Sequence, residues 1–308
     1  AYEIRLSLVG SEMCIRDRRR RLEERPAAGG IGMIKPKYAV EYALLRSLEA
    51  VVSAPPLRVA FRWGEGLGMF AKRLLAKRDV LIASNLSHAF PDKPPAEIRR
   101  LADAVWRNIG RVAVEFIRSG EVLTPESVTV EGADHILKAF DGGKGVIVLS
   151  PHFCNWEYTG IILQRFVHQI TAIVRPMKNP LAEVWLQGKR SSGGVPFIPH
   201  RDAVRGSFRQ LRKNGGIGIL CDQNLYHGGV FATFFGRPAA TTTLPALLHI
   251  STGAPVVLAH TRREEGRFRL IIEPLAFPEM SEEADRLTAY TQFINDAMER
   301  VIRTKPEW

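Results

Sequence analysis

The stretch Val146-Ile-Val-Leu-Ser-Pro-His-Phe-Cys-Asn-Trp-Glu157 contains the clearest change of pattern in the chain. Residues 145–149 are apolar and mostly β-branched, which predicts a short buried strand. Pro151 has no amide hydrogen to donate and biases Ser150 toward extended geometry, so the strand should end there. From residue 155 onward, apolar residues recur at helical spacing. The stretch therefore predicts a strand, a short loop and a helix, which together form the repeating unit of α/β folds.

The same alternation of strand and helix continues from residue 128 to the end of the chain. Short apolar runs alternate with segments of helical spacing, and this order predicts a mixed, largely parallel sheet flanked by helices within an α/β core at residues 121–308. The predicted strands cover residues 128–131, 145–149, 170–174, 196–198, 216–221, 255–260 and 268–273, and the predicted helices cover 133–140, 156–167, 180–188, 201–213, 244–252 and 282–304.

Residues 33–120 are predicted to form a helical, membrane-associating region. Its first helical segment, 39–54, carries Glu41, Arg46 and Glu49. A segment so short and charged does not fit a helix that spans a bilayer, which needs about 20 apolar residues. A helix lying in the membrane interface, with nearby basic side chains close to lipid phosphates, fits better. An ordinary amphipathic helix pair packed on the core is the alternative interpretation.

Residues 1–32 have little periodicity and contain the basic run Arg18 to Arg21. A targeting arm is one interpretation. Part of the segment, residues 8–17, instead resembles a non-biological read-through sequence, so we expect 1–32 to be a non-native or disordered extension and the native chain to start at Met33. Without the seven Lys or Arg and five Asp or Glu of this segment, the net charge falls only from +11 to +9.

The chain is strongly basic, with a formal net charge of +11 and an isoelectric point of about 9.9. Such a surface attracts anionic partners. Membrane lipid or an acidic carrier protein fits better than nucleic acid, because the chain has no aromatic-interleaved RNA-binding pattern. It also lacks zinc-ligand spacing, a Gly-x-Gly-x-x-Gly fingerprint and a Walker sequence. We therefore expect no nucleic acid, no metal and no other cofactor.

His152 and Glu157 are the first candidates for chemistry. His152 is expected on the loop after the strand and Glu157 in the first turn of the helix, and the turn of the backbone can bring the two together. A histidine polarised by a carboxylate can take a proton from a hydroxyl group near neutral pH. Ser150 lacks the Gly-x-Ser-x-Gly elbow of a serine nucleophile. A general base that activates a hydroxyl group, or water, is therefore predicted.

Two other predicted strands end in polar residues. Arg175 follows residues 170–174 and could meet a phosphate or a developing oxyanion, or form a salt bridge with Glu157. Asp222 and Gln223 follow the predicted strand at residues 216–221, although capping of a turn is the simpler role for Asp222. Because the carboxyl ends of parallel strands meet at one edge of a sheet, we expect a single shared site.

An aromatic segment follows at residues 228–243. Phe231, Phe234 and Phe235 suit the wall of an acyl-chain groove, and ordinary core packing is the alternative. Thr241 precedes a predicted helix, where a hydroxyl group can cap the helix or contact an anion. We expect Phe235, Thr241 and Asn155, which opens the helix after His152, to contact substrate.

Taken together, these motifs resemble the late acyltransferases of lipid A biosynthesis, the lauroyl and myristoyl transferase family within the lysophospholipid acyltransferase superfamily. The resemblance covers roughly residues 35–308. It is carried by the order and spacing of the turn Asn85-Leu…Phe90-Pro91, His152-x4-Glu157, Arg175-Pro176, Asp222-Gln223, Phe234-Phe-Gly236…Pro238-Ala-Ala-Thr241 and Thr252-Gly-Ala-Pro-Val256.

The resemblance implies an enzyme at the cytoplasmic face of the bacterial inner membrane. Such an enzyme moves a fatty acyl chain from an acyl carrier protein thioester, or from coenzyme A, to a hydroxyl group of a lipid A precursor or a related glycolipid. It implies that His152 is the base, that Glu157 orients and charges it, and that Arg175 contacts substrate or the oxyanion. No metal or nucleotide is implied.

Three alternatives stay open. A glycerolipid acyltransferase also uses His-x4-acid, but usually carries a Phe-Pro-Glu-Gly block where this chain has Asp222-Gln223-Asn224. A non-catalytic lipid- or carrier-binding protein and a hydrolase are the other two. The chain also departs from the family pattern in its less apolar amino-terminal helices. It ends at Pro306-Glu-Trp308, where members usually continue into a tail rich in Trp and Arg, so the acceptor stays open.

Overall fold

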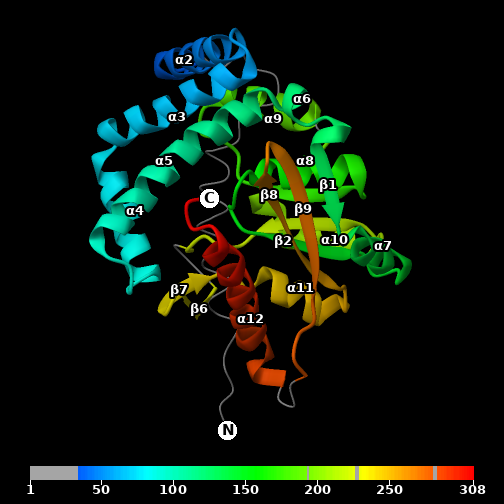
Figure 1. The fold of residues 1–308 in the computed structure, drawn as a ribbon. Helices are drawn as coiled ribbons and strands as arrows, with labels where there is room; N and C mark the ends of the chain where they lie inside the picture. The colour runs from blue at the N-terminus through cyan, green and yellow to red at the C-terminus, as the bar shows by residue number, and fades with distance from the viewer. Residues whose placement is uncertain (1–33, 193, 226–228, 280–282) are drawn as a thin grey trace. The chain divides into compact units, whose positions relative to one another are not determined.

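The computed structural model describes residues 34–192, 194–225, 229–279 and 283–308 (Figure 1). The chain forms two units, residues 1–41 and residues 42–308. Every strand described lies in the second unit. The predicted extension at residues 1–32 falls outside the described residues, so its nature stays a prediction.

The second unit is built on a sheet of seven described strands. All neighbouring strands pair in parallel except β8 and β9, which are antiparallel. The prediction of a mixed, largely parallel sheet flanked by helices is therefore confirmed. In spatial order the strands are β1 (Val128–Glu131), β9 (Arg267–Leu275), β8 (Val256–Glu264), β2 (Val146–Ser150), β5 (Gly216–Leu220), β3 (Ile170–Val174) and β4 (Phe197–Pro199).

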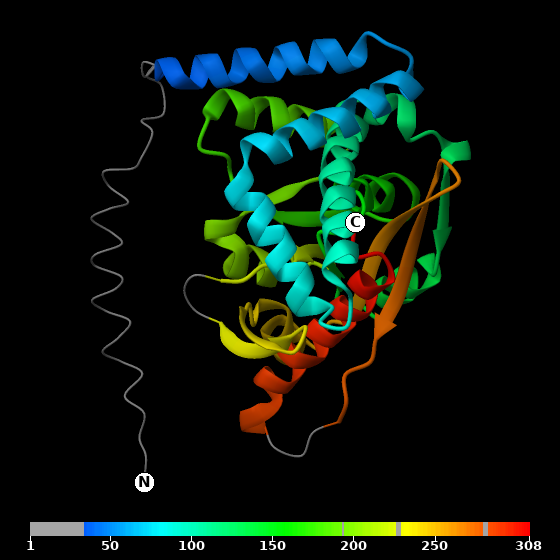
Figure 2. The same ribbon diagram turned by 60° about the vertical axis from the view of Figure 1, so that its left-hand side comes forward.

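Helices cover both faces of this sheet (Figures 1 and 2). Side chains of β2 alternate between the two layers, as the pleat of a strand requires. Ile147 and Leu149 pack toward α10 (Ala203–Leu211), α11 (Leu244–Thr252) and α12 (Glu283–Thr304). Val146 and Val148 pack toward α7 (Ala133–Asp141) and α8 (Trp156–Phe166). All five residues of β2 are buried, which explains why its sequence is a continuous apolar run.

A two-stranded hairpin beside α12 was missed by the sequence analysis. It consists of β6 (Val230–Phe234) and β7 (Arg237–Thr241), joined by Phe235 and Gly236. Both linking residues have positive φ, 48° and 74°, as a two-residue hairpin turn requires. The amide of Phe235 donates to Glu299 of α12 (2.7 Å), which ties this turn to the helix. Phe at a left-handed position gave no turn signal in the sequence.

The helical region predicted at residues 33–120 contains four long helices. The turn expected from Asn85 to Pro91 was partly wrong, because α4 continues to Ala89 and only the residues after it form the turn. None of the described helices is both long enough and apolar enough to cross a membrane. The helices are α2 (Pro36–Ser53), α3 (Leu57–Leu74), α4 (Ala76–Ala89) and α5 (Pro95–Ile117), and the short α6 (Ser119–Val122), η1 (Pro125–Ser127), α9 (Pro180–Ser192) and η2 (His200–Asp202) complete the described elements.

Glycines allow α3 and α5 to cross at very short range. A β-carbon at Gly68 would lie 2.0 Å from the carbonyl oxygen of Trp106, and one at Gly110 would lie 1.9 Å from that of Gly64. These distances are shorter than any non-bonded contact, so no side chain fits at either position. Gly66, two positions from both Gly64 and Gly68 in α3, has no atom within 4 Å of its virtual β-carbon.

This contrast predicts opposite effects for two alanine substitutions in one helix. Gly68→Ala should lower the free energy of unfolding by about 3 kcal/mol or more, since the helices must separate to admit the methyl group. Gly66→Ala should raise it by about 0.5–1 kcal/mol, because alanine is the better helix former. Urea unfolding of the two variants measures both effects. Equal effects from the two substitutions would contradict the close crossing.

His260 of β8 is buried without hydrogen bonds. It is 2% exposed, and neither ring nitrogen has a partner among the described residues. Burial lowers the pKa of His260 to about 4, and the charges of Arg262 and Arg300 act in the same direction. The ring is therefore neutral in the folded protein at pH 6, where an unfolded histidine is largely protonated.

The folded protein should lose stability on acidification through this histidine. Because the pKa of His260 is lowered in the folded protein, the neutral ring contributes to the free energy of unfolding above pH 6.5. This contribution is lost as pH falls from 6.5 toward 4, by about 3 kcal/mol in total. His260→Gln should remove this part of the pH dependence, whereas the exposed His200→Gln should not. Urea unfolding at pH 7.5 and pH 4.5 compares the three proteins, and parallel losses in all three would refute the assignment.

Candidate active site

The strand register places two chemically active residues side by side. β2 and β5 pair in parallel with Ser150 opposite Leu220, so the residues two positions further along, His152 and Asp222, leave the sheet together. β3, which ends before Arg175, adjoins β5 on its other side. The predicted convergence of strand ends at one edge of the sheet is therefore present.

His152 is held by Asp222 through two hydrogen bonds. The Asp222 carboxylate accepts from the His152 amide (2.8 Å), and its other oxygen lies 2.7 Å from Nδ1 of the ring. A carboxylate can only accept, so Nδ1 carries the proton and the neutral ring keeps a lone pair on Nε2. The His152 side chain is 27% exposed and that of Asp222 is 10% exposed. The arrangement is that of an oriented, accessible general base.

The prediction that Glu157 pairs with the His152 imidazole was wrong, because Asp222 occupies that position. Glu157, in the first turn of α8, instead binds Arg190 of α9 through two parallel bonds of 3.0 and 2.6 Å. The two side chains are equally exposed, at 18%. The arginine that pairs with Glu157 is thus Arg190, whereas Arg175 was the sequence-based suggestion.

Gln223 and Trp156 complete the surroundings of the ring. The Gln223 amide nitrogen lies 3.4 Å from Nε2 of His152, a distance at which it donates only weakly. The Trp156 ring meets the imidazole edge-on, with centroids 5.2 Å apart. Nε2 is therefore the ring nitrogen that a substrate hydroxyl can reach, by displacing the long contact to Gln223.

A cleft of about 460 Å³ lies against Asp222 and Gln223. Its walls are mainly apolar and come from α4, the β6–β7 hairpin and α12. Phe234 and Phe235 line it, in agreement with the predicted apolar wall, whereas Phe231 is 77% exposed and does not. Other residues that line the cleft include Ile82, Asn85, Leu86, His88, Phe90, Asn224, Arg237, Thr241 and Ile302.

The other residues predicted to contact substrate, Arg175, Thr241 and Asn155, differ in their accessibility. Arg175 is exposed after β3 and has no ion-pair partner among the described residues, so it is free to meet an anion. Thr241 is 4% exposed, and its hydroxyl donates to Ala239 and accepts from Asn295. Asn155 is fully buried, where it caps α8. The expectation that Asn155 contacts substrate is contradicted by this burial.

No alternative nucleophile adjoins the histidine among the residues described. The Ser150 hydroxyl is buried and donates to the carbonyl of Pro151 (3.3 Å). Burial raises the pKa of the Cys154 thiol to about 11, and it also raises that of Cys221. Both thiols are therefore protonated near neutral pH and are poor nucleophiles. Over the same described residues, no three His, Cys, Asp or Glu side chains are grouped as metal ligands would be.

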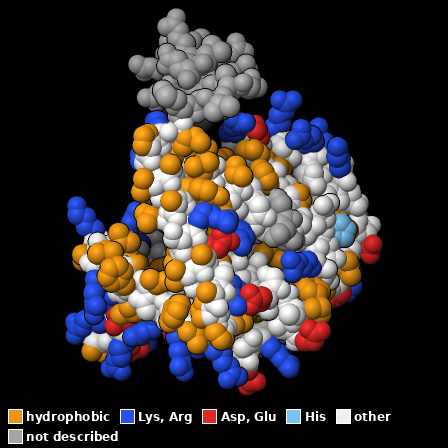
Figure 3. Space-filling view, turned by 90° about the horizontal axis from the view of Figure 1, so that it is seen from above, with side chains coloured by type: hydrophobic (Ala, Val, Ile, Leu, Met, Phe, Trp, Pro, Cys, Tyr) orange, Lys and Arg blue, Asp and Glu red, His pale blue; other side chains and the backbone are white. Residues whose placement is uncertain are grey.

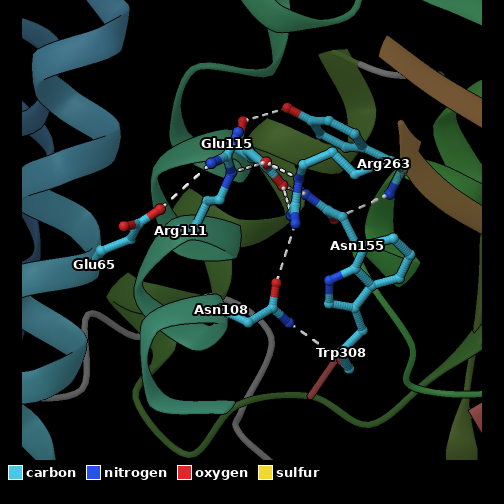
Figure 4. Close-up of polar contacts among 8 residues, drawn as sticks. Glu65, Asn108, Arg111, Glu115, Asn155, Arg263 and Trp308 are labelled. Atoms are coloured by element: carbon cyan, nitrogen blue, oxygen red, sulfur yellow. Dashed lines mark hydrogen bonds and ion pairs between the residues drawn. The ribbon is translucent and has the colours of Figure 1, made fainter. Parts of the chain in front are cut away.

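A buried polar cluster behind the site was missed by the sequence analysis (Figure 4). Glu115 of α5 is 0% exposed and binds Arg263 of β8. Glu115 lies on the apolar stripe of α5, and an acid on such a stripe is the one signal that could have revealed its burial. Nothing in the sequence indicates its partner, which is 148 residues away.

The sequence of this chain matches a known protein family over most of its length. The family model for bacterial lipid A biosynthesis acyltransferase matches residues 31–308. The chain belongs to this family. It is 26% identical to the lipid A biosynthesis lauroyltransferase of Escherichia coli over 287 residues, which cover 89% of this chain and 90% of that protein. The protein is therefore an acyltransferase, as the resemblance implied.

Two other relatives show the range of named activities. The palmitoleoyltransferase of lipid A biosynthesis in Escherichia coli is 25% identical, covering 89% of this chain and 90% of its own length. The phosphatidylinositol mannoside acyltransferase of Mycolicibacterium smegmatis is 28% identical, covering 70% of this chain and 73% of its own. All of these names describe acyl transfer in glycolipid synthesis.

Proposed function

We propose that this acyltransferase moves a fatty acyl group from a thioester to a hydroxyl group of a membrane glycolipid, with His152 as general base and Asp222 as its carboxylate partner. The observation that supports this best is the 2.7 Å contact between Nδ1 and Asp222. It leaves the lone pair of Nε2 for the proton of an acceptor hydroxyl.

The reaction follows from that geometry in two proton transfers. The acceptor hydroxyl gives its proton to Nε2 while its oxygen attacks the thioester carbonyl, and the resulting imidazolium is stabilised by Asp222. When the carbon–sulfur bond breaks, the imidazolium returns the proton to the leaving thiolate. An ester and a free thiol result. The acyl group passes directly to the acceptor, because the neighbouring Ser150 and Cys154 are unsuited to carry it.

Two polar residues are candidate contacts for the negative charge that develops on the carbonyl oxygen. Gln223 lies beside Nε2, and Arg175 stands exposed at the end of β3. Donors that are fixed before the reaction stabilise such an oxyanion strongly. Glu157 acts in this proposal by fixing Arg190, with no direct contact to the imidazole.

The cleft suggests the substrates. Its apolar lining, including Phe90, Phe234 and Phe235, fits hydrocarbon, and the polar residues Asn85 and Arg237 fit the headgroup of a glycolipid such as a lipid A precursor. The donor is an acyl carrier protein thioester, or coenzyme A. Exposed basic residues after β3 and β4 suit either of these anionic donors: Arg175, Lys178, Arg201 and Arg205.

Acyl transfer is tested with the purified protein and labelled acyl carrier protein thioester or acyl coenzyme A. The acceptors are lipid A precursors, phosphatidylinositol mannosides and lysophospholipids. We expect an acylated glycolipid, and His152→Ala should transfer roughly 10²-fold more slowly, the usual effect of losing a general base. Preference for lysophospholipids would identify a glycerolipid acyltransferase, release of free fatty acid a hydrolase, and binding without turnover a non-catalytic protein.

The same assay distinguishes the two carboxylates. Asp222→Asn preserves the shape of the side chain but removes the charge that orients and stabilises the imidazole, so kcat should fall roughly 10²-fold or more. Glu157→Gln should lower kcat less, since it acts through Arg190. The exposed Asp202→Asn serves as the control and should match the unaltered protein. A larger loss from Glu157→Gln than from Asp222→Asn would restore Glu157 as the direct partner.

We also propose that α3 and α4 hold the enzyme at the cytoplasmic face of the inner membrane. Large apolar side chains are exposed on α3, including Trp63, Phe70 and Leu74, which are 47%, 55% and 68% exposed. Val80 and Leu81 of α4 are 69% and 48% exposed. Seen from above, hydrophobic side chains gather on one side of the molecule among Lys and Arg (Figure 3). A helix of this kind lies in the lipid interface.

Flotation with vesicles of phosphatidylglycerol and phosphatidylethanolamine tests this attachment. Trp63 and Phe70 are seven positions apart and share one helix face. The double variant Trp63→Glu, Phe70→Glu should bind the vesicles at least about ten-fold more weakly. Two apolar side chains that enter the lipid are replaced by negative charges that anionic lipid repels. Leu137→Glu, which alters a 46% exposed residue of α7, is the control. Equal binding by all three proteins would reject α3 as the attachment site.

A further inference from the structure

The strongest feature outside the proposed chemistry is the ion pair between Glu115 and Arg263. The guanidinium donates from Nε to Oε1 (2.7 Å) and from Nη2 to Oε2 (2.8 Å), and the carboxylate is 0% exposed (Figure 4). Burial alone would lower the pKa of Arg263, but the adjacent Glu115 carboxylate raises it above its ordinary value. Burying such a pair costs desolvation free energy that apolar residues would not. A role besides packing would account for this cost.

Glu115 also holds the start of α8. Its Oε2 accepts a hydrogen bond from the side-chain amide of Asn155 (3.1 Å), and its backbone carbonyl accepts one from the Tyr158 hydroxyl (2.6 Å). Asn155 in turn caps the helix, since its side-chain oxygen accepts from the Tyr158 amide (3.3 Å). Two residues at the start of one helix are thus fixed to a single residue of α5.

Only two residues separate Asn155 from His152, and neither is free to adjust. Phe153 is 1% exposed, and Cys154 is buried with a φ of 53°, a left-handed conformation that few residues other than glycine adopt. The loop is consequently held at both ends. Asp222 fixes His152 at one end through its amide and ring, and Glu115 fixes Asn155 at the other.

We propose that Glu115 and Arg263 are positioning residues for His152, acting through Asn155. The proposal rests on the proposed function, in which the imidazole must keep Nδ1 on Asp222 and present Nε2 to the acceptor hydroxyl. Neither residue touches substrate. Arg263 fixes the two oxygens of Glu115, Glu115 fixes Asn155, and the short rigid loop passes that position to the catalytic ring, whose alignment decides the rate.

Asn155→Ser separates this role from a purely structural one. Serine caps helices about as well as asparagine, so α8 keeps its cap, but its hydroxyl is too short to reach Glu115 in the same way. The ion pair itself stays intact, so this variant should fold. Glu115→Gln is the companion variant, which also leaves Arg263 without its counter-charge. Arg269→Gln is the control, because Arg269 of β9 forms ion pairs with Glu131 (3.1 Å) and Glu264 (3.6 Å), outside this cluster.

The first measurement needs no turnover. In protein labelled with ¹⁵N-histidine, with the resonances of His152 assigned from their loss in His152→Gln, the ring nitrogens report which one carries the proton. We expect the single Nδ1–H form in the unaltered protein and in Arg269→Gln. We expect a mixture of the two tautomers in Asn155→Ser and Glu115→Gln. An unchanged Nδ1–H form in both of those variants would overturn the proposal.

The second measurement is steady-state acyl transfer. Asn155→Ser should lower kcat roughly ten-fold to a hundred-fold with KM changed less than about three-fold, the pattern of a misaligned catalytic group with intact binding. A change confined to KM would overturn the proposal. If the unaltered protein transfers no acyl group while the tautomers shift as expected, the proposed function fails and the positioning role stands.

Discussion

The parallel pairing of β2 with β5 is the constraint on which the rest of the site depends. With Ser150 opposite Leu220, a shift of a single residue would turn Asp222 to the other face of the sheet and leave the His152 ring without its carboxylate. The register is secured by burial, because all five residues of β2 are enclosed by the two helical layers. A large apolar core therefore fixes a polar contact of 2.7 Å at its edge.

The His152–Asp222 pair and the Glu115–Arg263 pair differ in their exposure to water. His152 and Asp222 stay partly exposed, so the ring can exchange protons with a bound substrate. Glu115 is fully buried and Arg263 is only 10% exposed, so removal of either charge would leave the other without its partner in a mostly dry environment. The accessible His152 ring suits chemistry, and the more deeply buried ion pair suits rigidity. Asn155 connects them, because it caps α8 while it binds Glu115.

The helical region and the hairpin complete the site from outside the sheet. α4 and the β6–β7 hairpin supply the apolar walls of the cleft, and α12 holds the hairpin through Glu299. The close crossing of α3 and α5 at Gly64, Gly68 and Gly110 leaves the large side chains of α3 pointing away from the protein. The same helix thus packs tightly on one side and offers an apolar surface on the other.

The sequence by itself determined the strands, most helices and the candidate base, because these depend on local patterns. The apolar run 145–149 followed by Pro151 identifies a buried strand and its end, and the chain order of His152, Arg175 and Asp222 places them at successive strand ends. The β6–β7 hairpin was not predicted, because its turn has Phe235 in a left-handed conformation, where the sequence pattern gives no turn signal.

Only the tertiary structure decided which charges meet. Glu157 is five residues from His152 and Asp222 is seventy away, yet the distant carboxylate holds the ring because parallel register, and not chain distance, sets the contacts at a sheet edge. Glu157 turns instead to Arg190, and Glu115 is buried against Arg263. Such pairings join segments far apart in the chain, so no local pattern of residues encodes them.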